Sequence, residues 1–249
     1  MALHFGDGTN PTTCIGSTAG VPKGLPPCTI ATWVKFDQVS TVNYHFAVFD
    51  PTVTYGLAFA NASGTEYMVS NHGSQAAATV DSLVAGRWYF CVGRAIGETD
   101  TRIDVLDSAT GVVTSAQDTT DVGSSTTATE LICIGGIPDG GGGFTPYFTG
   151  ATAEAWYADC DIAPAGGAAS IELMHQLAYG GPFSVPRIAP YVRFYKSLRS
   201  TWVNKMTESF SVENTVWTPT GGNPDLHPHP PLPYWYRRPS GLITRPSLI

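Results

Sequence analysis

Charged side chains are scarce in this sequence, at 13% of its 249 residues, which is about half the usual share of a soluble domain. No run of about 18 uncharged apolar residues occurs, so no membrane-spanning helix is predicted. Helical periodicity is almost absent, which argues against a helical bundle and against an alternating βα fold. What remains is a chain rich in apolar residues, with 27 glycines and 19 prolines for turns, as expected of a protein built from short strands.

The few charges are unevenly distributed. Residues 1–185 hold 5 basic and 17 acidic side chains, whereas residues 186–249 hold 8 basic and 3 acidic ones. A basic end suggests contact with an acidic protein surface, its own or a neighbour's. The simple alternative is an acidic body that keeps the protein soluble. Because an acidic body repels phosphate, we expect no nucleic-acid partner.

Residues 1–8 lack the basic start and the apolar segment of a signal peptide, so synthesis in the cytoplasm is expected. The five cysteines are an odd number without CxxC spacing. In a reducing compartment they are expected to be buried small hydrophobes rather than a disulfide framework. After oxidation, Cys14 and Cys28 are the candidate pair.

Polar and apolar residues alternate repeatedly through the first 160 residues. In segment 29–36, β-branched and aromatic side chains follow this period of two, which is typical of a strand. Turn-forming residues separate such segments, including four consecutive glycines at 140–143. Many short strands with such turns predict a β-sandwich. The predicted strands are 29–36, 44–49, 54–60, 66–70, 87–94, 102–107, 111–116, 130–135 and 148–157.

One short helix is predicted over residues 170–179. Ile171, Met174, Leu177 and Ala178 share one face of it. The glycine pair at 180–181, followed by a proline, ends it.

The chain changes character after residue 185. One further strand is predicted at 191–197, and from Pro219 onward prolines, glycines and aromatics dominate. Repeated proline excludes helix and interior sheet and favours extended chain. Aromatic side chains there would anchor the segment to a surface; a disordered tail is the simple alternative. We predict a domain of residues 1–185 and an extended arm of residues 186–249. The predicted anchors of the arm are Tyr234, Trp235, Tyr236, Arg237 and Arg238.

Three pieces of sequence together resemble the concanavalin A-like, laminin G-type superfamily. CTIATWVKF at 28–36 is similar to its early strand, and AGRWYFCV at 85–92 to the segment before a strand pair. LICIGG at 131–136, with YFTGATAEAWY at 147–157, is similar to its closing strands, and the predicted helix matches its closing helix. The resemblance covers residues 3–180 and implies an all-β, antiparallel jelly-roll sandwich. It implies little about function, because this fold hosts lectins, hydrolases, adhesion modules and virion proteins.

A second resemblance is to phage structural proteins of this fold. It rests on GGPF at 180–183 and HPPL at 229–232. It implies a non-enzymatic virion subunit, for example a capsid decoration, cement or tail-associated protein. Such a subunit would form a homo-oligomer, for example a trimer, and dock its arm on neighbouring virion proteins.

The carboxylates do not form a recognisable hydrolase motif. A retaining glycosidase needs two carboxyl groups about 5–5.5 Å apart. The closest cluster of carboxylates is Glu154, Asp159 and Asp161. Glu154 and Asp159 are five residues apart, so an uninterrupted strand would place them on opposite faces. Asp104 and Asp107, three residues apart, meet the same obstacle. We therefore expect no enzymatic activity, with an unrecognised hydrolase as the third possibility.

No cofactor is expected, and Ca²⁺ is the one metal that some relatives of this fold would suggest. The carboxylates available as oxygen ligands are Asp50, Asp118, Asp121 and Asp139. No loop motif groups them, so solvated loop acids are the favoured interpretation. His227 and His229 have a spacing usable by zinc but lie in the proline-rich arm, where surface or interface roles are favoured.

The alternative function is a carbohydrate-binding, lectin-like module for surface attachment, with Ca²⁺ as a candidate aid to sugar binding. A sugar platform needs exposed aromatic side chains at one rim. Trp33, Trp88 and Trp156 lie in the strands that carry the resemblance and are expected in the core, so they do not supply it.

Overall fold

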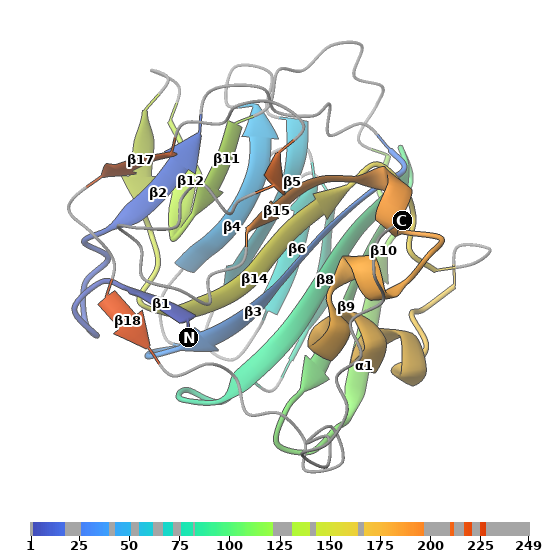
Figure 1. The fold of residues 1–249 in the computed structure, drawn as a ribbon, viewed down its shortest axis with the longest axis horizontal. Helices are drawn as coiled ribbons and strands as arrows, with labels where there is room; N and C mark the ends of the chain where they lie inside the picture. The colour runs from blue at the N-terminus through green and yellow to red at the C-terminus, as the bar shows by residue number, and fades with distance from the viewer. Residues whose placement is uncertain are drawn as a thin grey trace, which may run out of the picture.

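Two antiparallel sheets face each other across a shared apolar interior (Figure 1). The computed structural model describes residues 2–17, 26–39, 43–50, 55–61, 67–71, 76–81, 83–121, 131–139, 143–163, 167–196, 210–211, 217–220 and 225–227. All strand pairings among these residues are antiparallel.

The first sheet is built around two long central strands, β3 and β14, and it gathers strands from both ends of the chain. Its order is β10 (Val113–Asp118), β9 (Asp100–Asp107), β8 (Trp88–Gly97), β3 (Cys28–Phe36), β14 (Gly150–Ala158), β1 (Ala2–Phe5) and β18 (Asp225–His227). In addition, β15 (Val192–Lys196) pairs with β14, and β16 (Phe210–Ser211) pairs with β15.

The second sheet has seven described strands, and a separate two-stranded ribbon lies between β11 and β14 in the sequence. The order of the sheet is β17 (Trp217–Thr220), β2 (Cys14–Ser17), β11 (Leu131–Ile134), β4 (Asn43–Asp50), β5 (Tyr55–Asn61), β6 (Tyr67–Asn71) and β7 (Ala76–Val80). The ribbon pairs β12 (Gly136–Pro138) with β13 (Phe144–Pro146).

The strand β3 is buried on both of its faces. Cys28, Ile30 and Val34 point into the interior between the sheets, whereas Ala31 and Trp33 belong to a second apolar cluster on the outer face of the first sheet. That outer face is covered by α1 (Ile171–Gly180) and by the turns η2 (Pro182–Ser184) and η3 (Ala189–Tyr191). The helix is tied to the sheet because the indole Nε1 of Trp33 donates to the carbonyl of Ala178 at 2.8 Å.

The helix α1 has clear start and stop signals. The hydroxyl of Ser170 accepts the backbone N–H of Leu173, which satisfies one of the free donors of the first turn. Gly181, at φ +72°, ends the helix, and a positive φ of this kind suits glycine. The predicted helix at 170–179 is therefore confirmed. Its apolar residues Met174, Leu177 and Ala178 pack onto the first sheet, whereas Ile171, predicted to share their face, is 45% exposed.

Strands from the segment after residue 185 take part in both sheets. β15 and β18 extend the first sheet, and β17 lies at the edge of the second. Pro219 is tolerated within β17 because an edge strand has one side without a ladder partner. The predicted division of the chain at residue 185 stays a prediction, since most of 197–249 lies outside the described residues.

Candidate functional site

A buried arginine organises a polar cluster on the outer face of the first sheet. Arg94 of β8 is 0% exposed and donates from Nε and Nη2 to Asp104 of β9, at 3.1 and 3.0 Å. Its Nη1 donates to Asp161 at 2.8 Å, and Nη2 also donates to the carbonyl of Gly167 at 2.8 Å. A charge this deeply buried is tolerated because nearly all its donors are paired with opposite charge or carbonyl oxygen.

Asp104 uses its second oxygen to connect the sheet to the start of the helix. Its Oδ1 accepts the hydroxyl of Ser115 on β10 at 2.5 Å and the backbone N–H of Ala169 at 3.2 Å. The cluster therefore joins β8, β9, β10 and the loop that leads into α1. The consequence is structural: the cluster holds Asp161, Gly167 and Ala169, which precede α1, against the sheet.

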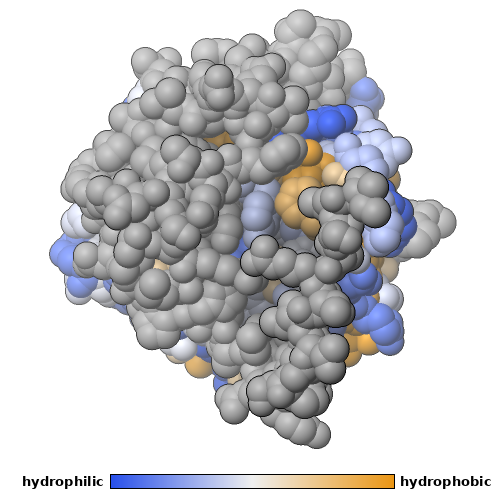
Figure 2. Space-filling view, viewed as in Figure 1, coloured by the Kyte–Doolittle hydropathy of each residue, from blue (hydrophilic) through white to orange (hydrophobic). Residues whose placement is uncertain are grey.

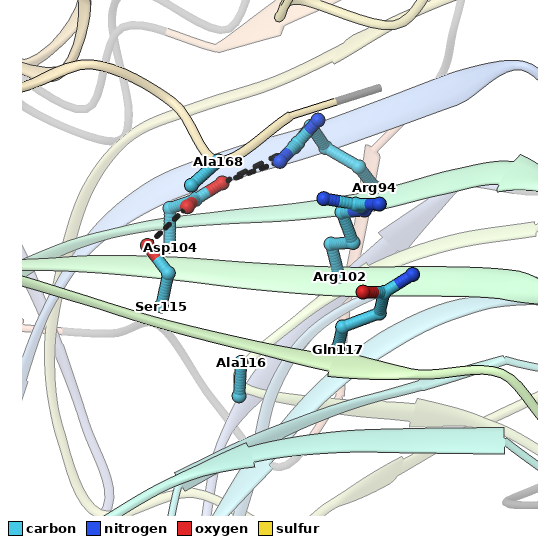
Figure 3. A pocket seen from close by; sticks show the side chains of 7 residues that line it. All are labelled: Arg94, Arg102, Asp104, Ser115, Ala116, Gln117 and Ala168. Atoms are coloured by element: carbon cyan, nitrogen blue, oxygen red, sulfur yellow. Dashed lines mark hydrogen bonds and ion pairs between the residues drawn. The ribbon is translucent and has the colours of Figure 1, made fainter.

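An open pocket of about 210 Å³ lies beside this cluster (Figure 3). Its lining residues are Arg94, Arg102, Asp104, Ser115, Ala116, Gln117 and Ala168. The ladder registers explain the grouping, because Arg94 is opposite Arg102 and Arg102 is opposite Gln117. Residues directly opposite each other on neighbouring strands point to the same face, so these three side chains form a row across β8, β9 and β10.

The outer part of the row is held by one carboxylate. Asp100 accepts Nε and Nη2 of Arg102 at 2.8 and 3.0 Å, and it also accepts the amide of Gln117 at 3.0 Å. Figure 3 shows the Arg102 and Gln117 side chains next to each other, beside the hydrogen bonds that join Arg94, Asp104 and Ser115. The pocket therefore presents oriented hydrogen-bonding groups, which is what a small-ligand site requires.

The carboxylates considered for hydrolysis are each engaged in the structure. Asp104 and Asp161 both contact Arg94, a link that the sequence spacing did not indicate. Asp107 contacts Arg87 at 2.8 Å. Each of these three carboxylates therefore has at least one oxygen in an ion pair with an arginine.

The expectation of opposite faces for Glu154 and Asp159 assumed an uninterrupted strand, whereas β14 is interrupted and ends at Ala158. The register of β14 against β3 shifts between Ala153 and Trp156, and Glu154 has a φ of +53°. This is a β-bulge, which re-aims the following side chains. Glu154 accepts the hydroxyl of Tyr195 and Asp159 accepts Nε of Arg193, so both reach alternate residues of the same neighbouring strand, β15.

The interior between the sheets contains polar groups that the sequence analysis did not single out. His45 is 0% exposed, and its Nε2 lies 2.8 Å from the hydroxyl of Tyr67. Burial lowers the pKa of His45 to about 3, so the imidazole is neutral in the fold. Burial also raises the pKa of Cys91, whose thiol is hydrogen-bonded to Tyr67. The one sequence signal for this cluster is His45 itself, a histidine within the predicted strand 44–49.

The cysteines are free, and four of them are buried as expected. The suggested Cys14–Cys28 pair is wrong, because Cys28 points into the interior between the sheets while Cys14 lies in a small cluster with Cys133 and Phe144 outside it. The neighbour of Cys14 is Cys133, and burial together with the hydrogen bond between the two thiols raises the pKa of Cys133. The sequence analysis did not identify Cys133 as the neighbour of Cys14, because β2 and β11 are distant in sequence and adjacent only in the sheet.

The metal candidates do not come together in the described part of the chain, where no three His, Cys, Asp or Glu side chains form a group that could hold a metal ion. Asp139 accepts the backbone N–H of Gly143, and Asp118 accepts that of Thr120, each at 2.8 Å. These are turn contacts of the kind that loop aspartates commonly make. Calcium binding remains a prediction.

The predicted tryptophans and arm anchors have different outcomes. The three predicted core tryptophans are confirmed as buried, since Trp33, Trp88 and Trp156 are 0%, 7% and 0% exposed. They lie on the outer face of the first sheet, which α1 covers, and not in the interior between the two sheets. His227 belongs to β18 opposite Ala2. The anchors Tyr234, Trp235, Tyr236, Arg237 and Arg238, and also His229, lie outside the described residues. None of the described helices is long and apolar enough to cross a membrane.

No protein-family model and no curated protein matches this sequence. Solved structures do match. A native heptameric SAP-like pentraxin from Limulus polyphemus is 15% identical, with a TM-score of 0.52 over 72% of this chain and 82% of the pentraxin chain. The full-length tailspike protein 2 of an Escherichia coli O157:H7 bacteriophage is 11% identical, with a TM-score of 0.51 over 81% of this chain and 28% of the tailspike.

The enzymatically active domain of tailspike protein 2 from bacteriophage CBA120 gives a similar result, with 12% identity and a TM-score of 0.50 over 81% of this chain and 32% of that one. The chain thus spans about a third of the tailspike that it matches. At these identities the likeness concerns the fold alone. Together with the two antiparallel sheets and the helix packed on one of them, it confirms that this chain has the concanavalin A-like, laminin G-type jelly-roll fold.

Proposed function

We propose that this chain is a non-enzymatic structural protein of a phage virion, either a capsid decoration or cement protein or a tail-associated subunit. The observation that carries the proposal is the place of β18. It pairs with the outer side of β1, at one edge of the first sheet, and it directly precedes the segment that holds the aromatic and basic anchors. The part of the arm that follows residue 227 continues from a strand at a sheet edge, and we infer that it lies across a neighbouring subunit.

The likeness in fold to phage tailspike protein 2 over 81% of the chain supports the assignment to a phage. The absence of enzymatic activity is supported by the site itself. Asp104, Asp161 and Asp107 are held in ion pairs with arginines, and Glu154 is 3% exposed and bonded to Tyr195. Carboxylates held in this way are poorly placed to attack or protonate a substrate.

The proposed partners are further copies of this chain, for example in a trimer, and other virion proteins such as the capsid. Large apolar side chains stay partly exposed around α1, with Ile171 at 45% and Phe183 at 49%. Figure 2 shows hydrophobic surface on the side of the molecule where Figure 1 places α1. Exposed apolar groups of this kind favour protein contacts, which fits a subunit that works in an assembly on the virion.

The test is the solution mass, by light scattering on a sizing column, of the full chain and of a truncation after His227. The truncation keeps every described strand, including β18, so it is expected to fold. We expect a defined oligomer for the full chain and a folded monomer for the truncation. A full-length variant with Tyr234, Trp235 and Tyr236 all changed to Ala should behave like the truncation. A truncation that assembles as the full chain does would contradict the role given to the arm.

The second candidate function is carbohydrate binding at a surface, favoured by the pocket beside Arg94. Its lining brings five polar side chains to one open hollow, and sugar sites are built from a few such oriented groups. A glycan array probed with the full chain, in Ca²⁺ and in a chelator, tests it. Binding in both conditions would favour the pocket, binding only with Ca²⁺ would favour a loop site, and no binding in either would reject this candidate.

A further inference from the structure

The pocket has hydrogen-bonding groups left over after its own contacts are counted. Arg102 uses Nε and one N–H of Nη2 on Asp100, and no other residue of the described chain pairs with its Nη1. A guanidinium group has five N–H donors in a fixed plane, so three remain for a ligand. Gln117 donates to Asp100, and no described residue donates to its amide oxygen, which lies next to those donors in the row as an acceptor.

Ser115 adds a second acceptor. Its hydroxyl donates to Asp104, and a hydroxyl that donates can still accept two hydrogen bonds. By contrast, Asp104 is saturated by Arg94, Ser115 and Ala169. The pocket therefore offers donors and acceptors side by side, and a matching ligand must both accept and donate at neighbouring atoms.

The charge around the pocket selects against an anion. Two arginines, Arg94 and Arg102, face three carboxylates, Asp100, Asp104 and Asp161, and the whole protein carries a formal charge of −7. An added negative charge would be repelled, because like charges at short range disfavour binding. The positive charge of each arginine is already balanced within the site.

The size of the pocket sets the scale of the ligand. Its volume of about 210 Å³ is below the range of about 300–1,000 Å³ for pockets that hold drug-sized ligands. None of the described residues that line it is aromatic, so these residues contribute no stacking. A single small ring held by hydrogen bonds is the appropriate occupant, and its affinity for one site is expected to be weak.

We propose that this pocket binds two neighbouring hydroxyl groups of a neutral sugar ring, with Arg102 donating to them and Gln117 and Ser115 accepting from them. The proposal rests on the second candidate function and names its site and ligand class. Weak single sites suit an oligomeric protein, because several linked sites raise the overall affinity by about 10²–10⁴ without new contacts.

The experiment measures binding of the full chain to methyl glycosides of glucose, galactose and mannose and to glucuronate, by saturation-transfer NMR and titration. Two variants remove ligand contacts, Arg102→Ala and Gln117→Ala. The matched control is Thr114→Ala, on the same strand as Gln117 but opposite Val105, which belongs to the interior cluster. We expect each pocket variant to weaken binding of a neutral glycoside by about tenfold or more, the loss of one to two hydrogen bonds, and the control to bind as the wild type does.

Each of the other possible results contradicts a different part of the proposal. If the wild type binds a glycoside and both pocket variants bind it equally well, the carbohydrate function stands and the pocket is wrong. If glucuronate binds more tightly than the neutral glycosides, the ligand class is wrong. If the wild type binds none of these probes, this inference fails, and the glycan array then decides separately whether the second candidate function survives. Melting curves of the variants exclude loss of folding as the cause.

Discussion

The guanidinium group of Arg94 donates from two nitrogens to the same oxygen of Asp104, and the two side chains are 0% and 1% exposed. The two residues come from neighbouring strands, and the bond is reinforced by Asp161 from the loop before the helix. Removing one partner of a buried pair leaves the other charge without compensation, which is the most costly change at such a site.

We therefore expect Arg94→Met to lower the free energy of unfolding by about 3–5 kcal/mol, measured by urea denaturation. The matched control is Arg102→Met on the next strand, where the arginine is 18% exposed and pairs with Asp100. There the loss should stay within about 1 kcal/mol. The double variant Arg94→Met with Asp104→Leu should be less damaging than Arg94→Met alone, because no unpaired carboxylate remains at that position. Equal losses for the two single variants would show that the cluster does not hold the loop.

Acid should destabilise the protein through His45. Its pKa in the fold is about 3, against an ordinary value of 6.5, so the unfolded chain takes up a proton that the folded one refuses. The stability contributed by the neutral imidazole is full above pH 6.5 and is lost as the pH falls from 6.5 toward 3. The slope from this group is about 1.4 kcal/mol for each pH unit. Denaturation midpoints between pH 7 and pH 4 measure it.

Two variants separate titration of His45 from loss of packing. His45→Gln keeps a hydrogen-bonding partner for Tyr67 but cannot titrate, so its stability should fall less steeply with acid than that of the wild type. Tyr67→Phe leaves His45 buried and should keep the wild-type slope at a lower overall stability. If His45→Gln retains the full slope, the acid sensitivity comes from other groups.

The five thiols should differ sharply in reactivity. Cys14, Cys28, Cys91 and Cys133 are 0% exposed, whereas Cys160 is partly exposed and burial raises its pKa to about 11. At pH 8 its thiolate fraction should be about 100-fold below that of a free thiol with a pKa near 9. We expect iodoacetamide, followed by mass spectrometry, to label Cys160 first and slowly. The other four should react only after unfolding.

Cys160→Ser is the control for this experiment and should abolish labelling of the folded protein. Rapid labelling of Cys14 or Cys133 in the folded protein would contradict the burial of these two thiols in their cluster with Phe144. A thiol count below five in the unfolded, unreduced protein would show that a disulfide had formed.

Gly16 of β2 leaves room for the ring of Phe144. A Cβ at this position would lie 2.3 Å from the ring, closer than any real contact. Gly16→Ala should therefore cost about 1–3 kcal/mol through overpacking, measured as a lowered melting temperature. Gly97→Ala is the matched control, because nothing lies within 4 Å of its Cβ position. Adding Phe144→Leu to Gly16→Ala should recover part of the lost melting temperature, because the smaller side chain leaves room for the new Cβ. If the double variant recovers nothing, the clash with Phe144 is not the cause of the destabilisation.

The strands with strong alternation could be predicted from the sequence, and the polar site could not. Segment 29–36 became β3 because its period of two and its β-branched residues act locally. The four-residue β1 and β2 carry too few residues for a period to be visible. β17 was not predicted because Pro219 counts against a strand, and only its place at a sheet edge allows it.

The site depends on contacts that are distant in sequence. Arg94 meets Asp161 and Gly167, which follow it by 67 and 73 residues, and no spacing rule connects them. The faces of Glu154 and Asp159 could not be assigned from their spacing, because a bulge interrupts the alternation that the prediction assumed. A bulge leaves no clear signal in the sequence when its left-handed residue is a glutamate and not a glycine.

The pairing of β18 with β1 has a consequence for how the first sheet folds. Ala2 lies opposite His227, so the two paired strands are separated by more than 200 residues of sequence. Closing so long a loop costs conformational entropy before the pairing forms, and this side of the sheet is therefore expected to form late in folding. Until it does, the outer side of β1 presents a strand ladder that is open to pairing with other chains.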